Sequence, residues 1–260
     1  MSDLWQTIAL GIIEGVTEFL PVSSTGHLLV AEHWLGERSE LFNVAIQAGA
    51  ILAVVFIYWR RLLTLFTCLH DPPSQDYLAK LIVAFLITAV GGFVATRLGF
   101  RLADAIRPIA LALIIGGIAI LAIEQLIARR PLITTVTWNV AIWVGAAQIL
   151  AGVLPGTSRS AATIFAAMLA GLTARPAATE FAFLVGIPTM FAATGYELLK
   201  VRDQAASEDW TALAIGFLVS GVVAFIAVKW LLRYIQTHRF TVFAWYRIVL
   251  GLALLLMALD

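Results

Sequence analysis

The sequence has little charge and almost no cysteine. Asp, Glu, Lys and Arg make up 13% of its 260 residues, against roughly 25% in soluble domains, and 61% of its residues are hydrophobic. This balance excludes an ordinary soluble enzyme and a disordered chain, and it is typical of a helical protein that crosses a membrane several times. The single cysteine, Cys68, excludes an internal disulfide and a cysteine metal cluster. A net charge of only +1 gives no indication of a nucleic-acid partner.

Six stretches are long and apolar enough to cross a bilayer as helices, which takes roughly 20 residues each. They are Asn43–Trp59, Lys80–Leu98, Pro108–Ala128, Glu180–Leu199, Thr211–Leu232 and Thr241–Leu259. Transmembrane β-strands would be shorter and would alternate between polar and apolar residues. The sequence therefore predicts an all-α polytopic membrane protein with six transmembrane helices, in which residues 1–260 form a single integral membrane domain.

Two further apolar regions are each interrupted by a short polar segment. Leu4–Leu35 contains the segment Pro21–His27, and Ala141–Leu172 contains the segment Pro155–Ser160. Non-helical backbone at membrane depth persists only where it is buried in protein or lines a wet cavity. Each region is therefore predicted to be a re-entrant helix–loop–helix hairpin.

The two hairpins resemble each other in sequence. Gly11-x-x-Glu14 lies ten and seven residues before Pro21, and Gly145-x-x-Gln148 lies ten and seven residues before Pro155. Each hairpin is followed by three predicted spans, which predicts two repeats, residues 1–130 and residues 131–260. Because three is an odd number, the second hairpin would enter from the opposite side, as in an inverted-topology repeat.

Charged residues are concentrated at the centres of the two hairpins, which inversion would bring together near the middle of the membrane. Glu14, Glu18 and His27 belong to the first hairpin and Arg159 to the second. A charge at the bilayer centre costs ~2.5–3.5 kcal/mol on an insertion scale, so such residues are functional candidates. Glu14 and Glu18 share a helix face and would repel unless a cation, a proton or Arg159 lies between them. The structural alternative is a pair that reaches out to the membrane interface.

The polar centres also contain groups suited to phosphoryl transfer. His27 lies three residues after Ser24, so it is a candidate either to accept the hydroxyl proton or to attack phosphorus itself. Arg159 offers a planar fork that matches a phosphate, and hydroxyls and backbone N–H groups at the start of the next helix would add to the site. An inter-helix salt bridge is the alternative role for Arg159.

At these residues the sequence resembles a known family. Glu14–His27 (EGVTEFLPVSSTGH) closely resembles the first signature of the bacterial undecaprenyl-pyrophosphate phosphatases, the bacitracin-resistance family, and Pro155–Ser160 resembles the second. Ile46–Val54, Glu180–Leu184 and Tyr246-Arg247 resemble further segments in the family's order, so the resemblance covers essentially the whole chain. The departures from the pattern, Ala48 and Ala161, concern packing rather than chemistry.

The resemblance implies a multi-pass protein of the bacterial inner membrane whose active site opens to the periplasmic or outer face. It implies an enzyme, a hydrolase acting on a diphosphate anhydride. That enzyme removes the terminal phosphate of undecaprenyl pyrophosphate and so recycles the lipid carrier of peptidoglycan and cell-wall synthesis. Carried over by motif, the catalytic residues are Glu14, Glu18, Ser24, His27 and Arg159. The expected substrate-binding residues are Ser23, Thr25, Gln47, Gly156, Thr157, Ser158, Ser160 and Arg247.

The sequence leaves several alternatives open. The nucleophile is either Ser24, with His27 as its base, or His27, with Glu18 orienting the ring or the water. Glu14 and Glu18 are candidates to hold Mg²⁺ or Ca²⁺, which prefer hard oxygen ligands, and no organic cofactor is expected. A polyprenyl pyrophosphate lipid and the bilayer are the expected partners, with a homodimer as one oligomeric alternative. The main rival function is a secondary transporter or flippase for a polyprenyl phosphate; an intramembrane protease is a weaker rival, because it leaves Arg159 unexplained.

Overall fold

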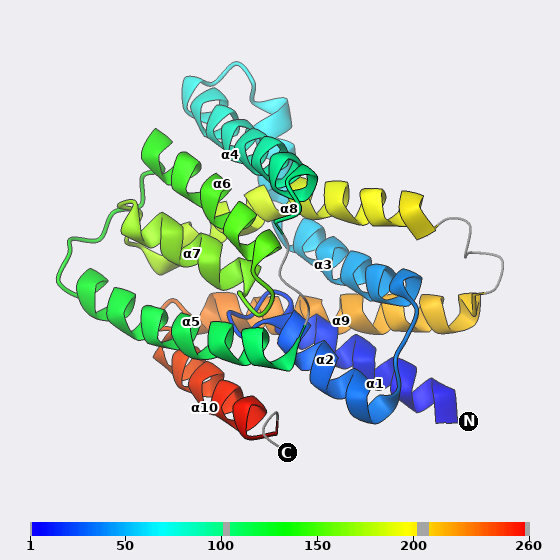
Figure 1. The fold of residues 1–260 in the computed structure, drawn as a ribbon. Coiled ribbons are helices and arrows are strands. Elements are labelled where there is room, and N and C mark those ends of the chain that lie inside the picture. The colour runs from blue at the N-terminus through cyan, green and yellow to red at the C-terminus, as the bar shows by residue number, and fades with distance from the viewer. Residues whose placement is uncertain (1, 101–104, 202–207, 258–260) are drawn as a thin grey trace.

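The computed structural model describes residues 2–100, 105–201 and 208–257, and in these ranges the chain forms ten α-helices (Figure 1). The helices are α1 (Ser2–Thr17), α2 (Ser24–Leu35), α3 (Glu40–Thr67), α4 (Pro72–Arg97), α5 (Ile106–Ile127), α6 (Trp138–Val153), α7 (Arg159–Leu169), α8 (Arg175–Val201), α9 (Trp210–Tyr234) and α10 (Thr241–Met257). The prediction of an all-α protein is confirmed.

Five of the helices are long and apolar enough to cross a membrane: α3, α4, α5, α8 and α9. Each contains or closely matches a predicted span. Helix α10 corresponds to the sixth predicted span, Thr241–Leu259, but its described part has 17 residues, and the end of that prediction lies outside the described residues. Large apolar side chains such as Phe56, Ile118 and Leu218 are exposed on the outer faces of these helices. The chain is therefore a polytopic membrane protein.

The long helices extend beyond the apolar stretches that predicted them. Helix α3 continues past Trp59 through Arg60 and Arg61 to Thr67. Helix α4 begins at Pro72 and is capped by the Asp71 side chain, which accepts a hydrogen bond from the Ser74 backbone. Hydropathy marks only the part of a helix that suits hydrocarbon, whereas the backbone continues helical until a cap or a breaker ends it.

The four shorter helices α1, α2, α6 and α7 form the two predicted helix–loop–helix hairpins. In Figure 1, α1 and α2 reach the centre of the bundle from the right, and α6 and α7 reach it from the upper left. Their connecting loops meet at the centre. Each hairpin also packs against a long helix: α1 of the first contacts α9, and α6 of the second contacts α4. The pairs α3–α8 and α5–α10 are also in contact.

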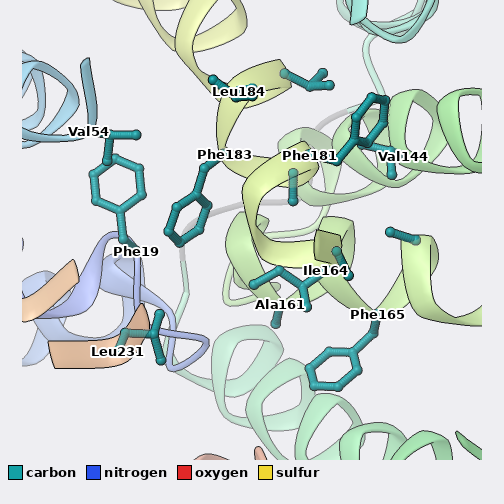
Figure 2. Packing of buried hydrophobic residues seen from close by; sticks show 14 of the residues in the cluster. Phe19, Val54, Val144, Ala161, Ile164, Phe165, Phe181, Phe183, Leu184 and Leu231 are labelled. Atoms are coloured by element: carbon teal, nitrogen blue, oxygen red, sulfur yellow. The ribbon is translucent and has the colours of Figure 1, made fainter. Parts of the chain in front are cut away.

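The hydrophobic core lies directly against the first loop. Phe19, which follows the carboxylate of Glu18, packs edge-on against Phe183 of α8 with ring centroids 5.3 Å apart. Figure 2 shows these two rings together with Val54 of α3 on one side and the α7 side chains Ala161 and Phe165 on the other. The loop is thus anchored by close-packed side chains on both of its flanks, which limits how far its polar groups can move.

Helices α5 and α10 approach each other closely because their contact surface contains glycine. A Cβ atom placed on Gly251 of α10 would lie 2.7 Å from the backbone oxygen of Ala110 in α5. Small residues at such positions let helix backbones come together in a membrane, where packing rather than the hydrophobic effect drives association. This close contact sets the position of α10 relative to the loops.

We expect Gly251→Ala to destabilise the protein by about 1–3 kcal/mol, because the added methyl group must push α10 away from α5. Thermal unfolding in detergent measures this. The matched control is Gly92→Ala in α4, where a Cβ would meet nothing within 4 Å. There alanine favours the helix by about 0.5–1 kcal/mol, so the control should be neutral or slightly stabilising. Equal effects of the two substitutions would contradict the close-contact argument.

Candidate active site

The first loop contains a strained residue immediately before the candidate nucleophile. Ser23 has a φ angle of 76°, and it is the only non-glycine residue with positive φ in the described part of the chain. Such a conformation costs of order 1–3 kcal/mol and persists where the surroundings over-determine it, often at functional sites. Ser23 also directly precedes α2, so the strained turn sets the direction in which Ser24 leaves the loop.

The hydrogen bonds of the first hairpin pair Ser24 with Glu18. The Ser24 hydroxyl donates to Oε2 of Glu18 over 2.5 Å. His27 has different partners: its Nδ1 lies 2.7 Å from the Ser23 carbonyl oxygen, and its Nε2 lies 2.6 Å from the Tyr246 hydroxyl. Among the described residues no hydrogen bond joins Ser24 to His27, so in this arrangement the carboxylate is the base nearest to the serine proton.

The second loop presents Arg159 at the start of a helix. Gly156 has a φ angle of 81°, a left-handed conformation that favours glycine. Ser158 caps α7 by accepting a hydrogen bond from the Ala161 backbone over 3.2 Å, and its hydroxyl lies 2.9 Å from that of Ser160. Arg159 is the first residue of α7, where the helix dipole also favours an anion.

Two residues tie the loops to each other. The Ser160 hydroxyl donates to the backbone oxygen of Leu20 over 3.0 Å. Arg247 of α10 is 1% exposed, and its guanidinium donates to the carbonyl oxygens of Pro21, Ala112 and Gly156 at 3.4, 3.2 and 3.2 Å. These bonds join α10 to both loops and to α5, while the Arg247 Nε atom is buried without a hydrogen-bond partner; its role in substrate binding stays a prediction. Its geometry is that of a structural clamp.

The two carboxylates lie beneath the loops. Glu14 is 1% exposed, Glu18 is 7% exposed, and Glu14 interacts electrostatically with Glu18 and Arg159. Glu18, Arg159 and Gln148 also line a cavity of about 20 Å³ between the hairpins. The Arg159 Nη1 atom and both amide atoms of Gln148 are buried there without a hydrogen-bond partner. The Nη1 donors of Arg159 are therefore free of protein partners, which is compatible with its predicted role toward an anion, while its charge also acts on Glu14.

The predicted site residues do not all come together. Ten of them lie in the two loops or interact with residues of the loops: Glu14, Glu18, Ser23, Ser24, His27, Gly156, Ser158, Arg159, Ser160 and Arg247. Thr157 lies beside Ser158 on the second loop, facing a larger groove. Thr25 is exposed and Gln47 is half-buried in α3, and neither forms a hydrogen bond with the described residues.

Two residues at the site were missed by the sequence reasoning. Tyr246 contacts His27, and the available signal was its place next to Arg247 in an otherwise apolar span. Gln148 lines the cavity, and its signal was the alignment of Gly145-x-x-Gln148 with Gly11-x-x-Glu14, which puts an amide where the first repeat has a carboxylate.

The residues present are compatible with a hard metal ion but do not form a complete ligand set. No group of three or more His, Cys, Asp or Glu side chains suited to a metal is found within the described ranges. Glu14 and Glu18 supply carboxylate oxygens, and the unpartnered Oε1 of Gln148 is a further hard oxygen. Mg²⁺ commonly binds through one or two carboxylates plus substrate phosphates, so a diphosphate would have to complete the shell.

The fold and the site define a class: a polytopic helical membrane protein with a carboxylate–hydroxyl–arginine site between two hairpin loops. A profile described as "Bacitracin resistance protein BacA" matches residues 7–253. The chain is 66% identical to the undecaprenyl-diphosphatase of Rhizobium etli over 255 residues, which cover 97% of this chain and 96% of the relative. It is 55% identical to that of Xanthomonas oryzae pv. oryzae over 258 residues, 98% of this chain and 97% of the relative. The chain belongs to the bacitracin-resistance BacA family.

We expect Arg247→Met and Arg159→Met to have different effects on stability. Losing the Arg247 clamp leaves three carbonyl groups without their donor and should lower the free energy of unfolding by about 2 kcal/mol or more. Arg159 has a buried Nη1 atom without a protein partner and acts on Glu14 through its charge only, so its loss should lower stability less than the loss of Arg247 while activity falls. Thermal unfolding of both variants in one detergent measures the difference. Equal destabilisation by the two changes would show that the clamp assignment is wrong.

Proposed function

We propose that this chain hydrolyses undecaprenyl diphosphate to undecaprenyl phosphate and inorganic phosphate. Relatives at 55–66% identity over nearly the full length carry the name undecaprenyl-diphosphatase. The structural observation that carries the proposal is the hydrogen bond between Ser24 and Glu18 in one loop, next to an Arg159 in the other loop that has donors free for an anion. Transport of a lipid phosphate alone would need the arginine but not a serine paired with a carboxylate.

A groove beside the second loop supports a lipid substrate. It has a volume of about 780 Å³, runs along α5 between Arg107 and Ile123, and is closed by apolar side chains of α6 and α7. Its polar part is formed by Arg107, Thr157, Ser158 and Arg247. Part of a polyprenyl chain fits such a groove while the diphosphate lies at the loops.

In the first step, the Ser24 oxygen attacks the terminal phosphorus. The new Oγ–P bond forms as the bond from that phosphorus to the bridging oxygen breaks, and undecaprenyl phosphate leaves. Glu18 takes the serine proton through the 2.5 Å hydrogen bond. Arg159 and the backbone N–H groups at the start of α7 stabilise the charge spread over the transferred phosphoryl oxygens.

In the second step, water attacks the phosphoserine and the Oγ–P bond breaks. Glu18 returns its proton to the Ser24 oxygen, and the protons of the water leave with inorganic phosphate. The alternative is a phosphohistidine on His27. It is less well supported, because both ring nitrogens of His27 already have hydrogen-bond partners and attack would require one of them to be given up.

The experiment that tests this function is phosphate release from undecaprenyl diphosphate by the detergent-purified protein. Ser24→Ala and Arg159→Met should each lower the rate by about 100-fold or more, because they remove the nucleophile and the main stabilising charge. Ser74→Ala at a half-buried position and Arg239→Met at an exposed position, the same chemical changes outside the site, serve as matched controls. No release by a folded wild type would favour the transporter.

The nucleophile can be identified by rapid quenching with substrate labelled on the terminal phosphate. We expect acid-stable label on Ser24. Acid-labile label on His27 would move the nucleophile to the histidine, and the absence of any trapped label would contradict both covalent routes.

We also propose that a divalent cation, Mg²⁺ or Ca²⁺, is held by Glu14 and Glu18 when the substrate is bound. Support comes from the two buried carboxylates and the amide oxygen of Gln148, all of them hard ligands. Such an ion would supply further charge neutralisation for the diphosphate.

Exhaustive chelation should therefore lower phosphate release by about tenfold or more, and added Mg²⁺ or Ca²⁺ should restore it. The variant Glu14→Gln should need a higher cation concentration for half-maximal rate. Full activity after chelation would remove the metal from the proposal.

For the membrane topology, we propose six transmembrane helices and two re-entrant hairpins arranged as inverted repeats, residues 1–130 and 131–260, with the site open to the outer face of the bacterial inner membrane. The packing is consistent with the repeat. A Cβ atom placed on Gly11 of α1 would lie 3.0 Å from the backbone oxygen of Gly216 in α9. A Cβ atom placed on Gly145 of α6 would lie 2.7 Å from the backbone oxygen of Ala84 in α4. In the proposed alignment α1 corresponds to α6 and α9 to α4, so the two contacts are equivalent.

A further inference from the structure

Tyr246 forms a specific hydrogen bond with a catalytic candidate from the opposite end of the sequence. Its hydroxyl lies 2.6 Å from Nε2 of His27, and the planes of the two rings differ by only 4°. The two rings are therefore nearly parallel, with centroids 5.5 Å apart, and the hydroxyl lies within hydrogen-bond distance of a ring nitrogen that can either donate or accept.

The direction of this hydrogen bond follows from the other ring nitrogen. The partner of Nδ1 is the backbone oxygen of Ser23, at 2.7 Å, and a carbonyl oxygen can only accept. Nδ1 therefore carries the proton, and in the neutral ring Nε2 has the free lone pair. The Tyr246 O–H donates to that lone pair, so the two contacts together select one tautomer and one ring orientation.

The position of Tyr246 is set by the packing of α10. Its neighbour Arg247 is held by carbonyl groups of both loops and of α5, and Gly251, about one turn further on, lies in close contact with α5. The Tyr246 side chain itself is 46% exposed, so burial does not force its hydroxyl to seek a protein partner. The contact with His27 is thus a product of where α10 is fixed rather than of a need to satisfy a buried group.

We propose that Tyr246 is a positioning residue for His27 in the phosphatase reaction proposed above. It holds the imidazole between the strained Ser23 and α10, with Nε2 engaged on the α10 side. In this position the ring is not available as the base for Ser24, which leaves that role to Glu18. The proposal rests on the proposed function for its catalytic meaning, but the contact itself can be tested without any turnover.

The test combines a chemical probe with kinetics on the purified full-length protein. Diethyl pyrocarbonate reacts with unprotonated histidine nitrogen, and Nε2 of His27 must leave Tyr246 before it can react. Losing one such hydrogen bond in Tyr246→Phe should therefore speed the modification of His27 by about 3- to 10-fold. His33, His70 and His238 are exposed and serve as internal standards, read out by mass spectrometry.

The same variant should lower kcat by about 3- to 10-fold, because the imidazole bonded to Ser23, next to Ser24, is then no longer held in one orientation. KM should stay unchanged, because the groups proposed to bind the diphosphate remain in place. The matched control is Tyr196→Phe in α8, which deletes the same hydroxyl from a tyrosine that is 54% exposed. It should change neither the modification of His27 nor the kinetics.

Three results would overturn the proposal: unchanged modification of His27 in Tyr246→Phe, equal acceleration at all four histidines, or an unchanged kcat. If the wild type releases no phosphate from undecaprenyl diphosphate, the proposed function fails by itself. The modification rates would still decide whether Tyr246 holds His27, so the two failures are distinguishable.

Discussion

The contact between the two hairpin loops is the constraint on which the site depends. Arg247 and Ser160 join the loops through backbone carbonyl groups, at a depth where unpaired backbone would be costly. These hydrogen bonds satisfy backbone carbonyl groups in the loops that interrupt the helices. They also bring Arg159 of one hairpin close to the carboxylates of the other. The same bonds thus stabilise the irregular backbone and assemble the charged groups.

The two hairpins divide the chemistry between them. The first provides the hydroxyl and its base, with Ser24 bonded to Glu18 and the strained Ser23 directing the chain between them. The second provides a helix N-terminus and a guanidinium that keeps donors free. A site that forms only when both halves meet excludes water from the buried acids, which strengthens the electrostatic interactions in it.

Most of the fold could be predicted from hydropathy, because each membrane helix must satisfy its own backbone and so appears as one continuous apolar stretch. The helix ends could not be predicted as well. Helix α3 continues through Arg60 and Arg61, since charged side chains at the membrane surface do not interrupt helical hydrogen bonds. The candidate residues were also mostly found, because charges such as Glu14 and Arg159 are conspicuous in an apolar sequence. Gln47, chosen for its place in the first span, and Thr25, chosen by resemblance, form no hydrogen bond with the described residues.

The sequence alone determined the class of protein, the two hairpins and the inventory of reactive groups, because composition, periodicity and local motifs are properties of contiguous residues. Only the tertiary structure decided which groups are partners. Ser24 and His27 are three residues apart, yet Ser24 bonds to Glu18 and His27 bonds to Tyr246, 219 residues away. The bonds of Arg247 to carbonyl groups of both loops and of α5 depend on tertiary packing in the same way. Hydrogen-bond partners depend on how distant helices pack, and that packing is set by contacts such as Gly251 against Ala110, which no local pattern records.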